Sequence, residues 1–228
     1  MIFLKNHIKI EKSEVLRYMG YKGHDISDEL DSTIDKMTEL CLQLAEPKFT
    51  YGYFNPEYSD EAVTISGTHI TLRGNDIYRH LKGAKYFAVM AVTLGMNVER
   101  KIMLLEKTSM TEALIFDSAA NACIESAAEY VNSLISEESK SKNMYTNYRY
   151  SPGYGDFPIE MQNSLIPLLR CQTAIGLSVT ENSIMIPRKS ITAIIGVFDS
   201  PQTDKTSCEM CSMYHKCNIR KDGGKCAE

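Results

Sequence analysis

The stretch RYSPGYGDFP, residues 149–158, separates a long helical run from the apolar C-terminal part of the chain. Its ten residues include two prolines, two glycines, two tyrosines, a phenylalanine and an arginine. So many prolines and glycines exclude a regular helix or a central strand. The aromatic residues are equally untypical of a solvated loop. The composition therefore predicts an irregular loop, and it raises the question of what an arginine and several rings do there.

The segments on either side of this loop are regular. Residues 110–138 before it have the spacing of a long helix. After it, residues 158–176 predict a helix that Pro167 kinks or breaks. Residues 179–198 predict one or two strands, with a hairpin around residues 187–189.

The N-terminal half mixes strands and helices, without a repeat or a strict βαβ alternation. This order favours the α+β class, with a twisted and largely antiparallel sheet covered by helices. We expect one domain over residues 1–200 and a small Cys-rich tail over residues 201–228. The segments behind this prediction are strands at 1–12 and 85–95, a hairpin at 62–72, and helices at 14–23, 25–47, 75–83 and 96–107.

The composition narrows the classes of function. The chain has 228 residues and a net charge of -4. Its basic residues form no stripe, which argues against a nucleic-acid partner. No run approaches the roughly 18 apolar residues of a membrane span. The alternating N-terminus indicates a strand rather than a signal peptide, so we expect a cytoplasmic protein without a membrane partner.

The long helix predicts a buried face and a second line of side chains beside it. In the second line Glu125 and Glu129 are four residues apart and repel each other if they are exposed. One interpretation is a solvated flank, and the other is that Glu125 binds a cation. The buried face would consist of Phe116, Ala120, Ile124, Ala127, Val131 and Leu134, and the second line of Ser118, Ala122, Glu125 and Glu129.

The loop resembles the signature R-x-x-P-G-Y-x-x-x-P of the activation domain of cobalamin-dependent methionine synthase. The segment IESAAEYVNSLI is similar to the helix of that family in which a Glu precedes a Glu-Tyr pair by four residues. The segment TAIGLSVTENSIMIPRKSITAIIGVF resembles the part that follows the loop. Order and spacing agree from about residue 60 to residue 198. Because the domain stands alone here, we expect a separate activation subunit.

The resemblance implies that the chain binds S-adenosylmethionine and helps to convert inactive cob(II)alamin into methylcobalamin. The cobalamin would be held by a methionine synthase that lacks its own activation domain, and the electron would come from flavodoxin or ferredoxin. Methyltransferase-type activity would then arise only in the complex. The alternatives are a docking module and a reductive activator for another corrinoid methyltransferase.

The resemblance also assigns site residues. Arg149 offers a planar fork of donors to the carboxylate of the ligand. Tyr154 would face the groove, and Glu125 would lie near the positive end of the ligand; both are assigned to the methyl-transfer step. The full expected ligand-binding set is Arg149, Ser151, Pro152, Gly153, Tyr154 and Glu125.

A purely structural loop is the alternative to this site. Arg149 could then simply pair with Asp156 or Glu160. The sequence also departs from the family in two ways. An equivalent of the family's N-terminal ligand-contacting aspartate cannot be placed, and Gly155-Asp156-Phe157 stands where the family has smaller, less polar residues.

The C-terminal cysteines are spaced as C-x2-C-x5-C-x8-C. In a cytoplasmic protein this spacing indicates a metal rather than disulfides. Zinc and an iron-sulfur cluster are both compatible with four thiolates. The remaining cysteines, Cys41, Cys123 and Cys171, are expected to be buried thiols. The predicted metal ligands are Cys208, Cys211, Cys217 and Cys226.

Overall fold

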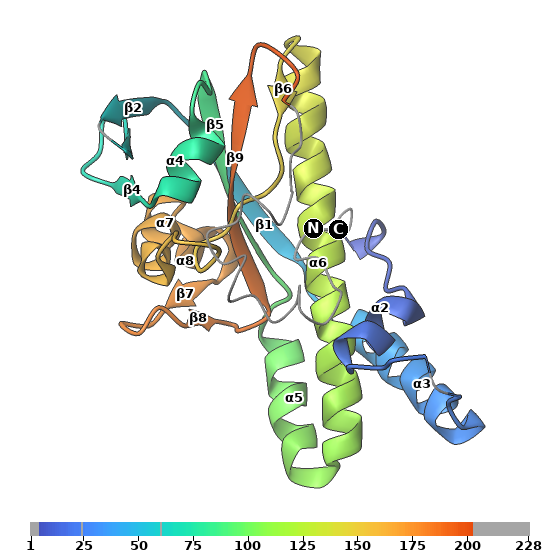
Figure 1. The fold of residues 1–228 in the computed structure, drawn as a ribbon. Coiled ribbons are helices and arrows are strands. Elements are labelled where there is room, and N and C mark those ends of the chain that lie inside the picture. The colour runs from blue at the N-terminus through green and yellow to red at the C-terminus, as the bar shows by residue number, and fades with distance from the viewer. Residues whose placement is uncertain (1–4, 24, 60, 203–228) are drawn as a thin grey trace. The chain divides into compact units, whose positions relative to one another are not determined.

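The computed structural model describes residues 5–23, 25–59 and 61–202 (Figure 1). The described residues fall into two compact units, and each is described here by itself. The elements β1, β5, α6, α7 and β9 contribute residues to both units. The described residues of the first unit lie within 5–50, 91–134 and 166–191, and those of the second within 51–90, 135–165 and 192–202.

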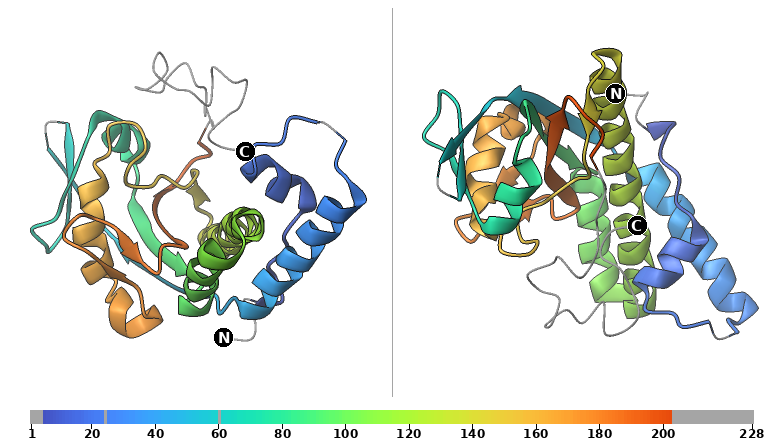
Figure 2. Two further views of the ribbon diagram at one scale, coloured as in Figure 1. Left: turned by 90° about the horizontal axis from the view of Figure 1, so that it is seen from below. Right: turned by 45° about the horizontal axis from the view of Figure 1, so that its top comes forward.

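The first unit is mainly helical. Its helices include α2 (Lys12–Tyr18), α3 (Asp28–Leu44), α5 (Met96–Thr108) and most of α6 (Met110–Ser141). The α5 helix runs beside the first turns of α6 in all three views (Figures 1 and 2). The unit also contains α8 (Cys171–Ile175) and the antiparallel pair β7 (Ser178–Val179) and β8 (Met185–Ile186).

The α3 helix shows why these segments fold as they do. The Ser27 hydroxyl caps it by accepting a hydrogen bond from the Leu30 N–H at 3.3 Å. Three acidic residues in the first turn stabilise the helix by interacting with the positive end of its dipole. Ile34, Met37 and Cys41 follow at helical spacing and are buried. The predicted stripe on α6 is likewise buried from Phe116 to Val131, whereas Leu134 is half-buried.

The second unit combines a small sheet with short helices. Strands β2 (Pro56–Ser59), β3 (Ala62–Ile65) and β4 (Thr71–Arg73) pair antiparallel in the order β2-β3-β4. Val63 pairs with Leu72 across β3 and β4, and both are fully buried. Helix α4 (Asn75–Leu81) packs on this sheet through its buried residues Ile77 and Leu81.

The larger sheet contains four strands in the order β1-β5-β9-β6. They are β1 (Lys48–Phe54), β5 (Tyr86–Thr93), β9 (Ser190–Phe198) and β6 (Tyr145–Thr146). Strands β5 and β9 are almost entirely buried, as their apolar runs predict. Strand β6 pairs antiparallel with β9, placing Thr146 opposite Val197. The α+β class with antiparallel pairing is therefore confirmed.

Two sequence predictions about strands were wrong. Residues 5–11 form no strand; the backbone N–H of Lys9 instead donates to the Ser126 hydroxyl at 3.0 Å. The expected hairpin at residues 187–189 is also absent. The chain turns earlier, where the Thr180 N–H donates to the Ile184 carbonyl at 2.9 Å, and β7 and β8 form the resulting hairpin.

Other predictions were confirmed. Helix α7 (Gln162–Leu168) contains Pro167 and ends just after it, and α8 begins after Arg170, whose φ is 50°. Cys41, Cys123 and Cys171 are buried free thiols. Burial raises the pKa of the Cys171 thiol to about 11.

Among the described residues, no helix combines the length and the apolar character that a membrane span requires.

Candidate functional site

The 149–158 loop, in the second unit, is closed by its own backbone. The Gly153 N–H donates to the Phe157 carbonyl at 2.8 Å, and the Phe157 N–H donates to the Tyr154 carbonyl at 2.9 Å. The Tyr154 N–H donates to the Ser151 carbonyl at 3.1 Å. Gly153 has a φ of 95°, which a side-chain-bearing residue rarely adopts. The loop is therefore irregular, as its composition predicts, yet internally hydrogen-bonded.

Strand β9 fixes the start of the loop. Tyr150 and Ile194 form an antiparallel bridge through two hydrogen bonds of 2.9 and 2.8 Å. The Tyr150 hydroxyl then donates to the Tyr154 carbonyl at 3.2 Å. Phe157 stacks on the Tyr150 ring, with centroids 6.2 Å apart, and is 1% exposed. Tyr150 and Phe157 thus form the internal support of the loop.

The end of the loop is joined to helix α4. The two carboxylate oxygens of Asp156 accept hydrogen bonds from the backbone N–H groups of Asn75, at 2.7 Å, and Asp76, at 3.0 Å. Asp76 in turn accepts a bond of 3.3 Å from the Asp156 N–H. The residue before the helix is Gly74, which has no side chain to cap it. Asp156 therefore supplies the helix cap that the local sequence lacks.

His80, near the C-terminal end of α4, packs behind the same loop. Its ring lies 5.1 Å from the Tyr150 ring and 4.7 Å from the Tyr148 ring. The Asn147 amide donates to the His80 carbonyl at 2.7 Å. Burial lowers the pKa of His80 to about 4, an effect that backbone carbonyls of Ile194 and Tyr148 partly oppose. His80 is therefore neutral at physiological pH.

The five predicted ligand-binding residues of the loop lie together on this support. Pro152 is buried, whereas Arg149 and Ser151 are half-buried. Gly153 is exposed, and Tyr154 is 48% exposed despite its large ring. Asp156 is engaged with α4. Of the five residues, Arg149 and Ser151 are thus partly accessible to solvent, and the Tyr154 ring is the most exposed large side chain.

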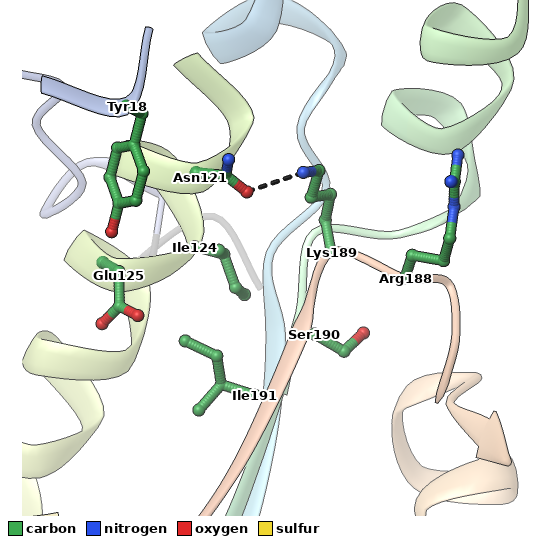
Figure 3. A pocket seen from close by; sticks show the side chains of 8 residues that line it. All are labelled: Tyr18, Asn121, Ile124, Glu125, Arg188, Lys189, Ser190 and Ile191. Carbon is green, nitrogen blue, oxygen red and sulfur yellow. Dashed lines mark hydrogen bonds between the residues drawn. The ribbon is translucent and has the colours of Figure 1, made fainter. Parts of the chain in front are cut away.

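The sixth predicted residue, Glu125, lines a cavity of about 290 Å³ in the first unit. Tyr18 from α2 and Asn121 and Ile124 from α6 form part of its wall. Figure 3 shows the Tyr18 hydroxyl directed toward the Glu125 carboxylate. The segment leading into β9 supplies the remaining lining residues, which are Arg188, Lys189, Ser190 and Ile191.

The two basic residues of this cavity are paired with carboxylates. The Lys189 ammonium lies 2.8 Å from an Asp117 oxygen and donates to the Asn121 side chain at 2.6 Å. The Arg188 guanidinium binds Glu99, which also accepts a bond of 3.1 Å from the Arg188 backbone N–H. The Glu99 carboxylate accordingly raises the pKa of Arg188. Because both cations are neutralised, the cavity is poorly suited to an anion.

The remaining site predictions concern metal binding. Cys208, Cys211, Cys217 and Cys226 lie outside the described residues, so a metal there stays a prediction. Within the described residues, no group of three or more His, Cys, Asp or Glu side chains is arranged to hold a metal ion.

Sequence reasoning missed several contributors to these regions. Tyr18, Asn121 and Lys189 line the cavity, and no motif marked them. Asp156 was considered only as a partner for Arg149, although its carboxylate caps α4. The glycine that precedes the NDIYRHL helix cannot cap it with a side chain. This was the one local signal that the helix needs a hydrogen-bond acceptor from elsewhere in the chain.

Comparison with known proteins adds a family and a fold. Residues 75–212 match the family model described as "Vitamin B12 dependent methionine synthase, activation domain". No curated protein matches the sequence. Among solved structures, the chain is similar to the one described as "Crystal Structure of the MetH Reactivation Domain bound to AdoHcy". The identity is 17%, with 97% of this chain and 83% of that chain covered and a TM-score of 0.66, which shows a shared fold.

Proposed function

Because the chain belongs to the family of vitamin B12-dependent methionine synthase activation domains, we propose that it binds S-adenosylmethionine and supports the reductive methylation of inactive cob(II)alamin. The observation that carries this proposal is the 149–158 loop, which lies within the matched residues and is closed by its own backbone hydrogen bonds. The AdoHcy bound to the similar MetH domain is the demethylated form of the same ligand. This agreement supports the ligand class.

The loop residues have chemistry that suits such a ligand. Arg149 would bind the carboxylate of the methionine part through its planar fork of donors. The Ser151 hydroxyl and the backbone at Pro152 and Gly153 would bind polar groups of the ligand. Tyr154 would offer its half-exposed ring to the sulfonium, since a cation is attracted to an aromatic face.

Glu125 is proposed as a ligand-binding residue on separate grounds, because it lines the cavity of the first unit. Its carboxylate and the Tyr18 hydroxyl lie beside the apolar side chains of Ile124 and Ile191 (Figure 3). With Arg188 and Lys189 already paired to carboxylates, this lining favours a positively charged or neutral group over an anion. The proposed preference agrees with a sulfonium ligand, and Glu125→Gln would test it.

The proposed reaction balances with one external electron. One electron reduces cob(II)alamin to cob(I)alamin, whose cobalt then takes the methyl group as the carbon-sulfur bond breaks. The products are methylcobalamin and S-adenosylhomocysteine. The cobalamin would be held by a methionine synthase, and flavodoxin or ferredoxin would give the electron. The domain would contribute orientation rather than acid-base catalysis.

The first test is binding of S-adenosylmethionine, measured by titration calorimetry. Arg149→Ala should weaken binding by roughly 1.5–3 kcal/mol, the range for a hydrogen bond to a charged group. Arg149→Lys should recover only part of this loss because it keeps the charge and not the fork. Arg73→Ala, at an exposed arginine of the same unit, is the matched control and should bind as the wild type does.

The second arm of that test follows methylcobalamin formation. The full chain is mixed with a cob(II)alamin-loaded methionine synthase, a reductant and S-adenosylmethionine, and the absorbance is recorded. Product formation that requires the chain supports the proposal. Ligand binding without product formation would favour a docking role instead, and the absence of any ligand binding would exclude the proposed function.

A further inference from the structure

Helix α4 contacts the 149–158 loop at two points. At its N-terminal end, the Asn75 and Asp76 N–H groups donate to Asp156. Near its C-terminal end, the His80 ring packs on Tyr150. A seven-residue helix thus holds both the start and the end of a loop that follows it by about 70 residues in the sequence. The loop position is therefore determined by α4 as well as by β9.

Two glycines make the contact with Asp156 possible. A Cβ on Gly74 would lie 2.7 Å from a carboxylate oxygen of Asp156 and 2.9 Å from its backbone oxygen. A Cβ on Gly155 would collide with the Asp76 carboxylate and with the Tyr150 hydroxyl. Both glycines also have positive φ, 126° and 53°. The backbones on the two sides can approach this closely only without side chains at these positions.

We propose that Asp156 is a positioning residue for the proposed ligand site. By capping α4 it fixes the end of the loop, so that the turn carrying Ser151 to Tyr154 is ordered before a ligand arrives. Ordering in the free protein removes an entropic cost from binding. This inference rests on the proposed function. It does not require Asp156 to touch the ligand.

Two readouts on the full chain separate this role from others. The first is amide hydrogen exchange without ligand, recorded for Gly153 and Phe157, whose N–H groups close the loop. In Asp156→Ala both should exchange about tenfold faster, the effect of losing one helix cap. The Tyr150 N–H, which is bonded to Ile194 at 2.9 Å, should be unchanged and serves as the internal control.

The second readout is the affinity for S-adenosylmethionine. Asp156→Ala should weaken binding about tenfold. Asp156→Asn retains one acceptor oxygen and should restore part of both the protection and the affinity. Asp199→Ala is the matched control, because it removes an exposed carboxylate of the same unit that pairs with Lys85 at 3.2 Å. It should change neither readout.

The outcomes distinguish the two proposals. If the wild type does not bind the ligand, the proposed function fails, while exchange still tests the link between Asp156 and the loop. Unchanged exchange in Asp156→Ala overturns the positioning role, whatever happens to affinity. Faster exchange with unchanged affinity overturns it as well, because the link would then serve stability alone.

Discussion

The loop of the second unit and the cavity of the first unit satisfy their charged groups in different ways. The Asp156 carboxylate is bound by main-chain N–H groups that the α4 helix holds in place. In the cavity, Lys189 and Arg188 are bound by side chains, chiefly Asp117 and Glu99. The N–H groups that bind Asp156 are fixed in the α4 backbone, whereas in each ion pair of the cavity both partners are side chains that can change rotamer. The contact of the loop with α4 thus depends on one movable side chain, and each ion pair of the cavity on two.

The largest effect on stability should come from a substitution at Gly74, where α4 approaches Asp156 of the loop. Gly74→Ala places a Cβ 2.9 Å from the Asp156 backbone oxygen at a φ of 126°. Because Gly74 also has ψ 141°, outside the left-handed helical region, backbone strain of about 1–3 kcal/mol and overpacking of about 1–3 kcal/mol should together lower the free energy of unfolding by about 3 kcal/mol. Urea unfolding measures the change.

Gly67→Ala is the matched control for that variant. Gly67 also has a positive φ, 75°, but nothing lies within 4 Å of its added Cβ. It should lose only the strain, about 1 kcal/mol. Equal losses in the two variants would show that close approach to Asp156 does not matter.

A smaller effect should follow from removing Glu99, which binds Arg188 of the cavity wall. Glu99 is 8% exposed and accepts two hydrogen bonds from Arg188. Glu99→Ala should lower the free energy of unfolding by about 2 kcal/mol, since hydrogen bonds to a charged group are lost. Glu106→Ala, at an exposed position of the same helix, should stay within about 0.5 kcal/mol. A loss below that limit for Glu99 would mean that Arg188 finds another partner.

A pH dependence from His80, which supports the loop from behind, is the smallest effect when it is expressed per unit of pH. Its folded pKa of about 4 lies below the ordinary value of 6.5, so the unfolded chain binds the proton more tightly. Stability from this group is complete above pH 6.5 and is lost as the pH falls from 6.5 toward 4. The slope should approach about 1.4 kcal/mol per pH unit.

Two variants separate the contribution of His80 to the pH dependence of unfolding from the contributions of other titratable groups. His80→Gln should flatten the pH dependence between these limits in urea unfolding, although it also lowers stability at neutral pH. His69→Gln removes an exposed histidine of the same unit and should keep the slope of the wild type. An unchanged slope in His80→Gln would contradict the assignment.

Local sequence patterns were sufficient to predict most of the helices and the buried strands. Helix α3 carries its cap, its acidic first turn and its apolar spacing within one segment. Strand β5 is apolar on both faces because it is buried on both. The short alternation of apolar and polar residues at the N-terminus gave a wrong strand prediction. The backbone of this segment binds a helix rather than a strand, since the Lys9 N–H donates to Ser126 on α6.

The failures share a non-local cause. The hairpin expected at residues 187–189 is prevented because Glu99, far earlier in the chain, binds both the backbone and the side chain of Arg188. The loop motif likewise marked Arg149 and Tyr154 through a resemblance. It could not reveal that Asp156 caps a helix formed by residues 75–81, because no periodicity links positions so far apart.

The distance between Asp156 and α4 has a consequence for synthesis of the chain. The first N–H of the helix is 81 residues ahead of the carboxylate that caps it. A ribosome adding about 5–20 residues per second needs on the order of 4–16 s to bridge that interval. During this time the segment NDIYRHL has left the ribosome before its acceptor exists. Because an isolated helix of seven residues is unstable in water, this segment gains its capped helix only after the loop has been made, and the two segments fold together.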